Sequence, residues 1–117
     1  MLDLETVGEV LVAKLRGELD LKTAGELRQG LDRALDGFTV RHLVLDLENV
    51  SFMDSTGLGV VLGRYKRLAG AGGKLVVLGL QPPVRRVLDL SGVLRIVPEF
   101  NTLKQAVEAL RRGEASA

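Results

Sequence analysis

Two short apolar runs, set between segments of helical periodicity, decide the fold class of this chain. The runs are "RHLVLDL" at residues 41–47 and "KLVVLGL" at residues 74–80, and amphipathic segments flank each of them. Short, continuously apolar runs of this kind are typical of strands that are covered on both faces of a parallel sheet. The sequence therefore predicts an α/β domain, in which helices carry the chain from the end of one strand to the start of the next.

The first residues follow a different pattern. Residues 2–16 alternate apolar and polar side chains on either side of Gly8, which predicts a hairpin of two half-buried strands. A last strand is predicted for "LRIVP", residues 94–98, at the edge of the sheet, because Pro98 cannot donate a hydrogen bond to a neighbouring strand. Together these patterns predict a mixed β-sheet of about five strands, with an N-terminal hairpin followed by alternating helix and strand.

Apolar residues three and four positions apart predict about four helices. They are expected from about Lys22 to Gly37, from Leu58 through Leu68 to the "AGAGG" segment, in "QPPVRRVLDLSG" and in "TLKQAVEALRR". Residues 1–112 are expected to form a single domain, since the chain has the usual length of one. The remaining residues, 113–117, read "GEASA" and are predicted to be a disordered tail.

Composition excludes several classes of function. The 16 basic and 15 acidic residues nearly balance and form no run of like charge, so nucleic-acid binding has no electrostatic footprint. The chain has no cysteine, which excludes disulfides and thiolate metal sites. No basic segment opens the chain as in a signal peptide, and no apolar run reaches the roughly 20 residues that span a bilayer. We therefore expect a cytoplasmic protein without a cofactor, and without nucleic-acid or membrane partners.

The stretch "SFMDSTGLGVVLGRYK", residues 51–66, places Ser55 at a strand-to-helix junction. A nucleophilic serine needs a base within hydrogen-bond reach. The single histidine, His42, is predicted to be a surface residue at the far end of the preceding strand. In addition, Met53 stands where a nucleophile elbow has glycine. Hydrolysis is therefore disfavoured.

The glycines of this stretch permit a second interpretation. Gly57, Gly59 and Gly63 follow a strand, but their spacing has neither the third glycine of a dinucleotide fold nor the lysine of a phosphate-binding loop. Because Gly59 and Gly63 are four residues apart, they are predicted to share a helix face and to allow close packing. Nucleotide binding stays the weaker alternative.

Carboxylates are the remaining candidates for metal ligands. Asp20, Asp46 and Asp54 could in principle hold Mg²⁺, as in a phosphorylated receiver domain. Such a domain, however, carries acidic residues just after the first strand of a parallel sheet. The predicted N-terminal hairpin argues against that arrangement.

Ser55 is left as a helix cap or as an acceptor of phosphate. An N-cap at Ser55 or Asp54 would stabilise the helix by about 1 kcal/mol. A cap alone does not explain why Asp54, Ser55 and Thr56 follow one another. A phosphate at this place would meet free N–H groups and the positive end of the helix dipole. The fold is therefore expected to survive phosphorylation.

The segment "DLENVSFMDSTGLGVVLGRYK" resembles the phosphorylation-site segment of anti-sigma-factor antagonists of the STAS-domain family, in particular the sporulation-type, SpoIIAA-like members. The resemblance continues upstream in "GELDLKTAGELRQGL" and downstream in "GGKLVVLGLQPPVRRVLDLSGVLRIVPEFNTLKQAVEAL". It covers nearly the whole chain and implies a single STAS-type domain.

The resemblance also implies a mechanism. Ser55 matches the serine that an anti-sigma factor with serine kinase activity phosphorylates. The unphosphorylated antagonist would bind that factor and free a sigma factor, and a PP2C-type phosphatase acting on phospho-Ser55 would restore binding. Asp20 matches an aspartate near the phosphorylation site, and Thr56 keeps the family pattern. The expected partner-binding residues are Asp20, Thr23, Asp54, Thr56, Gly57 and Leu58, in a protein that is not an enzyme.

An alternative within the same fold is a STAS scaffold, or the small subunit of a lipid transporter, without a phosphorylation switch. Such members often lack the serine or the "GRYK" continuation, so the sequence favours the switch. The sequence leaves open which sigma factor is controlled, whether the pathway is sporulation or stress, and the oligomeric state.

Overall fold

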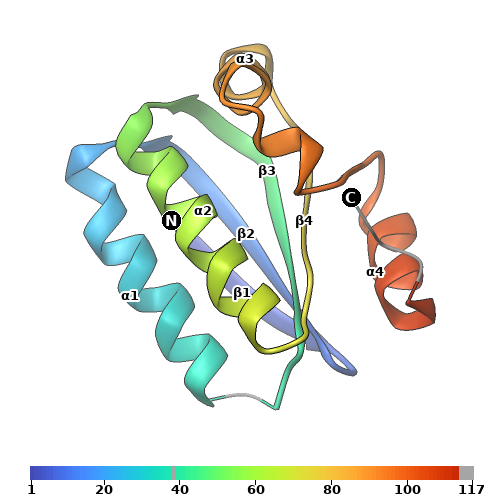
Figure 1. The fold of residues 1–117 in the computed structure, drawn as a ribbon. Helices are drawn as coiled ribbons and strands as arrows, with labels where there is room; N and C mark the ends of the chain where they lie inside the picture. The colour runs from blue at the N-terminus through green and yellow to red at the C-terminus, as the bar shows by residue number, and fades with distance from the viewer. Residues whose placement is uncertain (38, 114–117) are drawn as a thin grey trace.

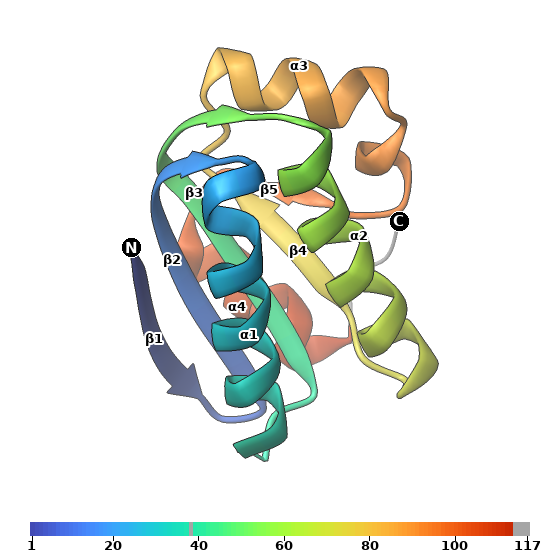
Figure 2. The same cartoon turned by 90° about the vertical axis from the view of Figure 1, so that its left-hand side faces the viewer.

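The computed structural model describes residues 1–37 and 39–113. These residues form a five-stranded sheet in the order β1-β2-β3-β4-β5, in which β1 and β2 are an antiparallel hairpin and the later neighbours are parallel (Figure 2). The strands are β1 (Leu2–Val7), β2 (Val10–Leu19), β3 (His42–Met53), β4 (Leu75–Leu78) and β5 (Glu99–Phe100). The predicted mixed sheet and its N-terminal hairpin are confirmed.

Four α-helices are formed by the described residues, as predicted. They are α1 (Leu21–Gly37), α2 (Ser55–Gly70), α3 (Pro82–Leu90) and α4 (Leu103–Arg112). Figure 1 shows α1 and α2 side by side on one face of the sheet, α4 on the other face and α3 across one end. No helix of residues 1–37 and 39–113 is long and apolar enough to cross a membrane.

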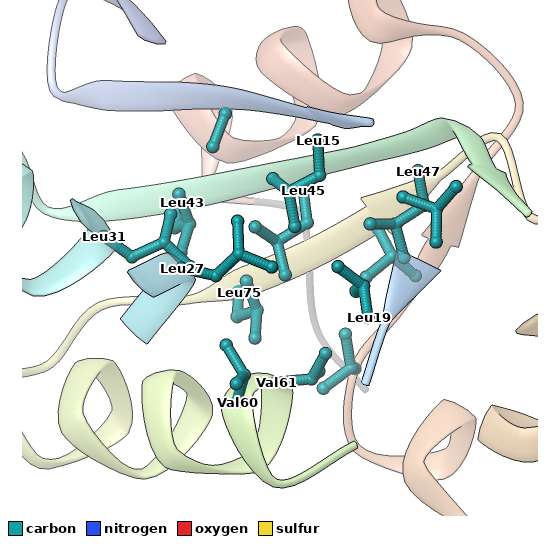
Figure 3. Close-up of a cluster of buried hydrophobic side chains, with 14 of the residues drawn as sticks. Leu15, Leu19, Leu27, Leu31, Leu43, Leu45, Leu47, Val60, Val61 and Leu75 are labelled. Atoms are coloured by element: carbon teal, nitrogen blue, oxygen red, sulfur yellow. The ribbon is translucent and has the colours of Figure 1, made fainter. Parts of the chain in front are cut away.

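The apolar runs are buried on both faces, which explains why they do not alternate. In β2, Leu11 and Leu15 point toward α1 and α2, whereas Val10 and Val12 point toward α4. Leucines of β2, β3 and β4 fill the larger core layer together with side chains from the helices (Figure 3). Each fully buried leucine or valine contributes about 1.5–3 kcal/mol to folding, so this layer fixes the helices on the sheet.

Ion pairs join α1 to α2. The buried Arg64 of α2 has its Nε 3.2 Å from Oδ1 of Asp32 in α1. Arg67, one turn further on, pairs with both Asp32 and Asp36. Burial lowers the pKa of the Arg64 guanidinium, and the negative charge of Asp32 opposes this shift. The helices α1 and α2 are therefore held together by ion pairs as well as by packing.

The prediction of a strand at residues 94–98 is wrong. Val93–Arg95 is a short 3-10 helix, and the two-residue strand β5 follows Pro98. Val93 and Val97 are both buried and lie four residues apart, a spacing that suits a helical turn. Pro98 does reach the sheet, but through its carbonyl, which accepts a hydrogen bond from the N–H of Val77 at 3.0 Å.

Two strands are longer than their apolar runs indicate. β2 continues beyond residue 16 to Leu19, and β3 continues beyond residue 47 to Met53. Both extend past the end of β4, which pairs only with residues 43–46 of β3. At the other end of the chain, Gly113 caps α4 in a left-handed conformation. The remainder of the predicted tail, residues 114–117, lies outside the described residues.

Candidate functional site

The extended ends of β2 and β3 bring two aspartates together. Leu19 and Met53 are partners across the parallel pair, and the next residues are Asp20 and Asp54. The N–H of Asp54 donates to the carbonyl of Leu19 at 3.1 Å. Since both strands end at the same edge of the sheet, α1 and α2 begin next to each other there (Figure 2).

Asp54 is the N-cap of α2. Its backbone is extended, and its Oδ1 accepts hydrogen bonds from the N–H groups of Thr56 at 2.9 Å and Gly57 at 3.1 Å. The capping role therefore belongs to Asp54 and not to Ser55. Ser55 is the first helical residue, its side chain is exposed, and no other described residue hydrogen-bonds its hydroxyl. The hydroxyl is free to react with a group from outside the domain.

Asp20 begins α1 in a similar way. Its Oδ1 accepts from the N–H groups of Lys22 at 3.0 Å and Thr23 at 3.2 Å. In return, the Thr23 hydroxyl accepts from the N–H of Asp20 at 3.0 Å, and it donates to the carbonyl of Glu18 at 2.7 Å. This is the reciprocal arrangement of a capping box, with threonine in the third position of the helix. Asp20 and Thr23 therefore give the site a fixed shape.

Gly57 seats the first turn of α2 directly on the end of β2. A Cβ at Gly57 would lie 2.7 Å from the Cβ of Leu19 and closer still to its carbonyl oxygen. The predicted close packing at Gly59 and Gly63 is wrong, because a Cβ at either position would meet nothing within 4 Å. Ser55 is thus placed relative to Asp20 by the absence of a side chain at Gly57, which is itself buried.

The expected partner-binding residues differ in how far their side chains are exposed to solvent. Thr56 and Leu58 are half-buried, and Leu58 packs against the large core layer. Leu21, directly after Asp20, was not among the expected residues, yet it is 78% exposed. It falls outside the apolar stripe that Ala24, Leu27 and their successors form on α1. An apolar residue outside the stripe is expected at the surface, so the sequence pattern could have identified Leu21 as part of the site.

His42 and Ser55 lie at opposite ends of β3, as the sequence indicated. The expectation that His42 is a surface residue is wrong: it is 9% exposed, and its Nδ1 accepts the N–H of Lys74 at 3.1 Å. Burial lowers the pKa of His42, and the positive charge of Arg41 lowers it further. His42 therefore holds the start of the sheet together and is not a base for Ser55.

Asp46 is separated from the two capping aspartates. It lies in the middle of β3, where it is buried and its Oδ1 accepts the N–H of Glu48 at 3.1 Å. Within residues 1–37 and 39–113, no three acidic or histidine side chains are grouped so that they could hold a metal ion. The site is an acidic surface on which the Ser55 hydroxyl is exposed.

A family model of the STAS domain matches residues 1–106. The chain belongs to the STAS domain family. Among curated relatives of this STAS protein, the anti-sigma F factor antagonist of Paenibacillus polymyxa is 44% identical over 101 residues, which is 86% of either chain.

Solved structures agree with this assignment. The anti-sigma factor antagonist SpoIIAA in its unphosphorylated form superposes with a TM-score of 0.83 at 32% identity, covering 96% of this chain and 97% of that one. The Bacillus cell-fate determinant SpoIIAA in its phosphorylated form superposes with a TM-score of 0.75 at 31% identity, covering 95% of this chain and all of that one. The STAS fold predicted from the sequence is confirmed.

Proposed function

We propose that this STAS protein is an anti-sigma-factor antagonist that is switched by phosphorylation of Ser55. Unphosphorylated, it binds an anti-sigma factor and so frees a sigma factor; phosphorylated, it releases the anti-sigma factor. The observation that carries the proposal is the exposed Ser55 hydroxyl, which forms no hydrogen bond with residues 1–37 or 39–113, while Asp54 caps the helix. Similarity to an anti-sigma F factor antagonist and to SpoIIAA in both phosphorylation states supports it.

The fold should tolerate the phosphate, but for a different reason from the one expected from the sequence. The N–H groups of Thr56 and Gly57 are not free for a phosphate, because the Asp54 carboxylate already binds them. Phosphorylation of Ser55 nevertheless breaks no hydrogen bond within the described part of the chain. It adds charge beside Asp54 and near the end of β2, where Asp20 lies. The main effect therefore falls on the surface and on any partner that contacts it.

The size of this effect can be estimated from charge alone. A phosphoserine adds about −1.5 to −2 charges at neutral pH. Against a partner carboxylate roughly 7 Å away, two charges repel by about 1–5 kcal/mol for an effective dielectric constant between 80 and 20. Since each 1.4 kcal/mol changes affinity about tenfold, the switch would weaken binding by about one to three orders of magnitude.

The domain supplies a substrate hydroxyl and a docking surface. His42 lies at the far end of β3 and cannot act as a base for Ser55. In the proposed cycle the partner kinase supplies the base, the ATP and the metal ion for phosphoryl transfer. A PP2C-type phosphatase acting on phospho-Ser55 completes the cycle. We place the protein in the cytoplasm, in a sporulation-type pathway, as a regulatory binding protein and not an enzyme.

The docking surface combines residues with two kinds of task. Asp20, Thr23 and Gly57 fix its shape through capping and packing. Asp54 adds charge as well as the cap, and the accessible parts of Thr56 and Leu58 offer direct contacts. An acidic centre with an apolar residue beside it fits a partner surface that carries basic and apolar side chains around a carboxylate facing Ser55, and this carboxylate would repel the phosphate.

The test is intact-mass analysis and peptide mapping after incubation with ATP and the cognate anti-sigma kinase. The parent chain should gain one phosphoryl group on Ser55, whereas Ser55→Ala should gain none and still bind the kinase. Ser51→Ala, a change at the exposed serine of β3, is the matched control and should be phosphorylated like the parent. Phosphorylation elsewhere than Ser55 would refute the proposed switch, and binding without any phosphorylation would favour a STAS scaffold.

A further inference from the structure

β1 presents an open edge of the sheet (Figure 2). Residue 1 pairs inward, since its carbonyl accepts the N–H of Arg16 at 2.9 Å, and the register continues to the Val7–Val10 pair. In an antiparallel pair, alternate residues direct both backbone groups toward the partner strand. Leu2, Leu4 and Thr6 therefore direct their N–H and C=O groups away from β2. Unpaired groups of this kind can template a further strand.

A groove runs between this edge and α1. It consists of two adjoining hollows of about 380 and 370 Å³, which share Leu2, Gly30 and Arg33 in their walls. Leu4, 39% exposed, and Ala34 add apolar surface. Gly30 has a specific task here, because a Cβ on it would lie 2.7 Å from a methyl carbon of Leu2. The glycine lets Leu2 lie close to α1. The hollow beside Leu4 and Ala34 is mainly apolar, whereas Glu26, Gln29 and Arg33 give the other hollow a polar wall.

The opposite face of β1 is acidic at its outer positions. Asp3 and Glu5 are both exposed; Asp3 lies 3.4 Å from Arg16, whereas no cation of the described residues forms an ion pair with Glu5. A residue placed beside Asp3 or Glu5 on an added strand would therefore meet a carboxylate. Opposite charges across a strand pair are favourable, and like charges are not.

These charges argue against a second copy of this chain at the edge. In an antiparallel pair of two β1 strands with aligned faces, any register that overlaps four or more residues sets Asp3 or Glu5 opposite another acidic residue. Like charges directly opposite each other destabilise such pairs. A strand with basic residues at these positions meets no such repulsion.

We propose that β1 and the groove beside α1 bind an extended segment of a partner protein by strand addition. The segment alternates apolar side chains, which enter the hollow beside Leu4 and Ala34, with Lys or Arg side chains, which lie opposite Asp3 and Glu5. Main-chain hydrogen bonds to Leu2, Leu4 and Thr6 supply affinity, and the two faces supply specificity. This surface runs along the side of the sheet and is separate from the end that carries Ser55.

The test uses the full chain and a capped six-residue peptide of alternating lysine and valine. At a peptide concentration about ten times the dissociation constant, amide hydrogen exchange measured by NMR should slow about tenfold at Leu4 and Thr6. Exchange at Asp3 and Glu5 should not change, because their N–H groups already face β2. The same peptide with glutamate in place of lysine should have no effect.

Two variants sharpen the result. Glu5→Lys should weaken binding of the lysine peptide about tenfold, which is 1.4 kcal/mol. Asp89→Lys, the same kind of charge reversal on the exposed face of α3, should bind it like the parent. Equal binding of both peptides, or no slowing at Leu4 and Thr6, would overturn the proposal. A concentration-dependent dimer that protects these same amides would also overturn it, in favour of a second copy.

Discussion

Replacing Gly57 by alanine should destabilise the domain, although alanine is the best helix former. The new methyl carbon would lie 2.7 Å from the Cβ of Leu19, about 1 Å inside ordinary van der Waals contact, and closer still to the Leu19 carbonyl oxygen. The Leu19 carbonyl group and Cβ cannot move to relieve this clash, so the first turn of α2 must move away from β2. Overpacking of this kind costs about 1–3 kcal/mol.

The matched control lies two residues away in the same helix. A Cβ at Gly59 would meet nothing within 4 Å, so Gly59→Ala should stabilise the helix by up to about 1 kcal/mol through propensity alone. Urea unfolding followed by circular dichroism measures both changes in the free energy of unfolding, and equal m-values show that the same transition is compared. The two substitutions are expected to have opposite signs.

The same pair tests the position of Ser55. If α2 lifts at its first turn, Ser55 moves relative to Asp20, so Gly57→Ala should also bind the anti-sigma factor more weakly at a temperature where it is folded. Gly59→Ala does not disturb the contact between α2 and the end of β2, so it serves as the reference for stability. A Gly57→Ala variant as stable as the parent, or a shift of both variants in the same direction, would refute this account of the glycines.

Three further predictions concern charge. Ser55→Asp adds one negative charge where a phosphate would add two. It should therefore weaken binding of the anti-sigma factor by about 0.6–2.4 kcal/mol if a partner carboxylate lies roughly 7 Å away. Ser55→Asn adds no charge and should leave the affinity unchanged, and calorimetric titration with the anti-sigma factor compares the two variants. Asp54→Ala should lower the free energy of unfolding by about 0.5–2 kcal/mol, because the helix cap is lost, and Asp54→Asn should lower it less. A larger loss for Asp54→Asn than for Asp54→Ala in urea melts would contradict the capping role. Burial holds the pKa of folded His42 below its unfolded value, so the unfolded chain binds more protons and stability should fall as pH drops through about 6.5. His42→Gln, which removes the titration among Arg41, Glu9 and Lys74, should flatten this part of the pH profile; an unchanged slope would show that His42 is not its source.

Periodicity gave most of the fold because the pattern of burial is simple. Strands β3 and β4 contain continuous apolar runs since both of their faces are covered, and the helices show the stripe that packs on the leucine layer. The segment after α3 could not be read in this way. Val93 and Val97 are compatible with a strand or with a helical turn, and only packing on the core decides between them.

The residues of the site were predictable, but their tasks depend on tertiary contacts. The order of Asp54 and Ser55 and the match of Asp20 could be read directly, whereas the choice of Asp54 as the cap depends on the backbone at one residue. Which glycine packs closely depends on how α2 is rotated over Leu19. The end of β3 was hidden because its last residues include exposed polar side chains that interrupt the apolar run.

The central claim is that phosphate on Ser55 changes the affinity for the anti-sigma factor without changing the fold. The most direct measurement is calorimetric titration of the anti-sigma factor with the unphosphorylated chain and with the chain phosphorylated on Ser55 alone, with amide NMR spectra of both forms. The account predicts affinity lower by about one to three orders of magnitude, with spectral changes confined to the ends of β2 and β3 and the starts of α1 and α2. Equal affinity of the two forms would contradict it.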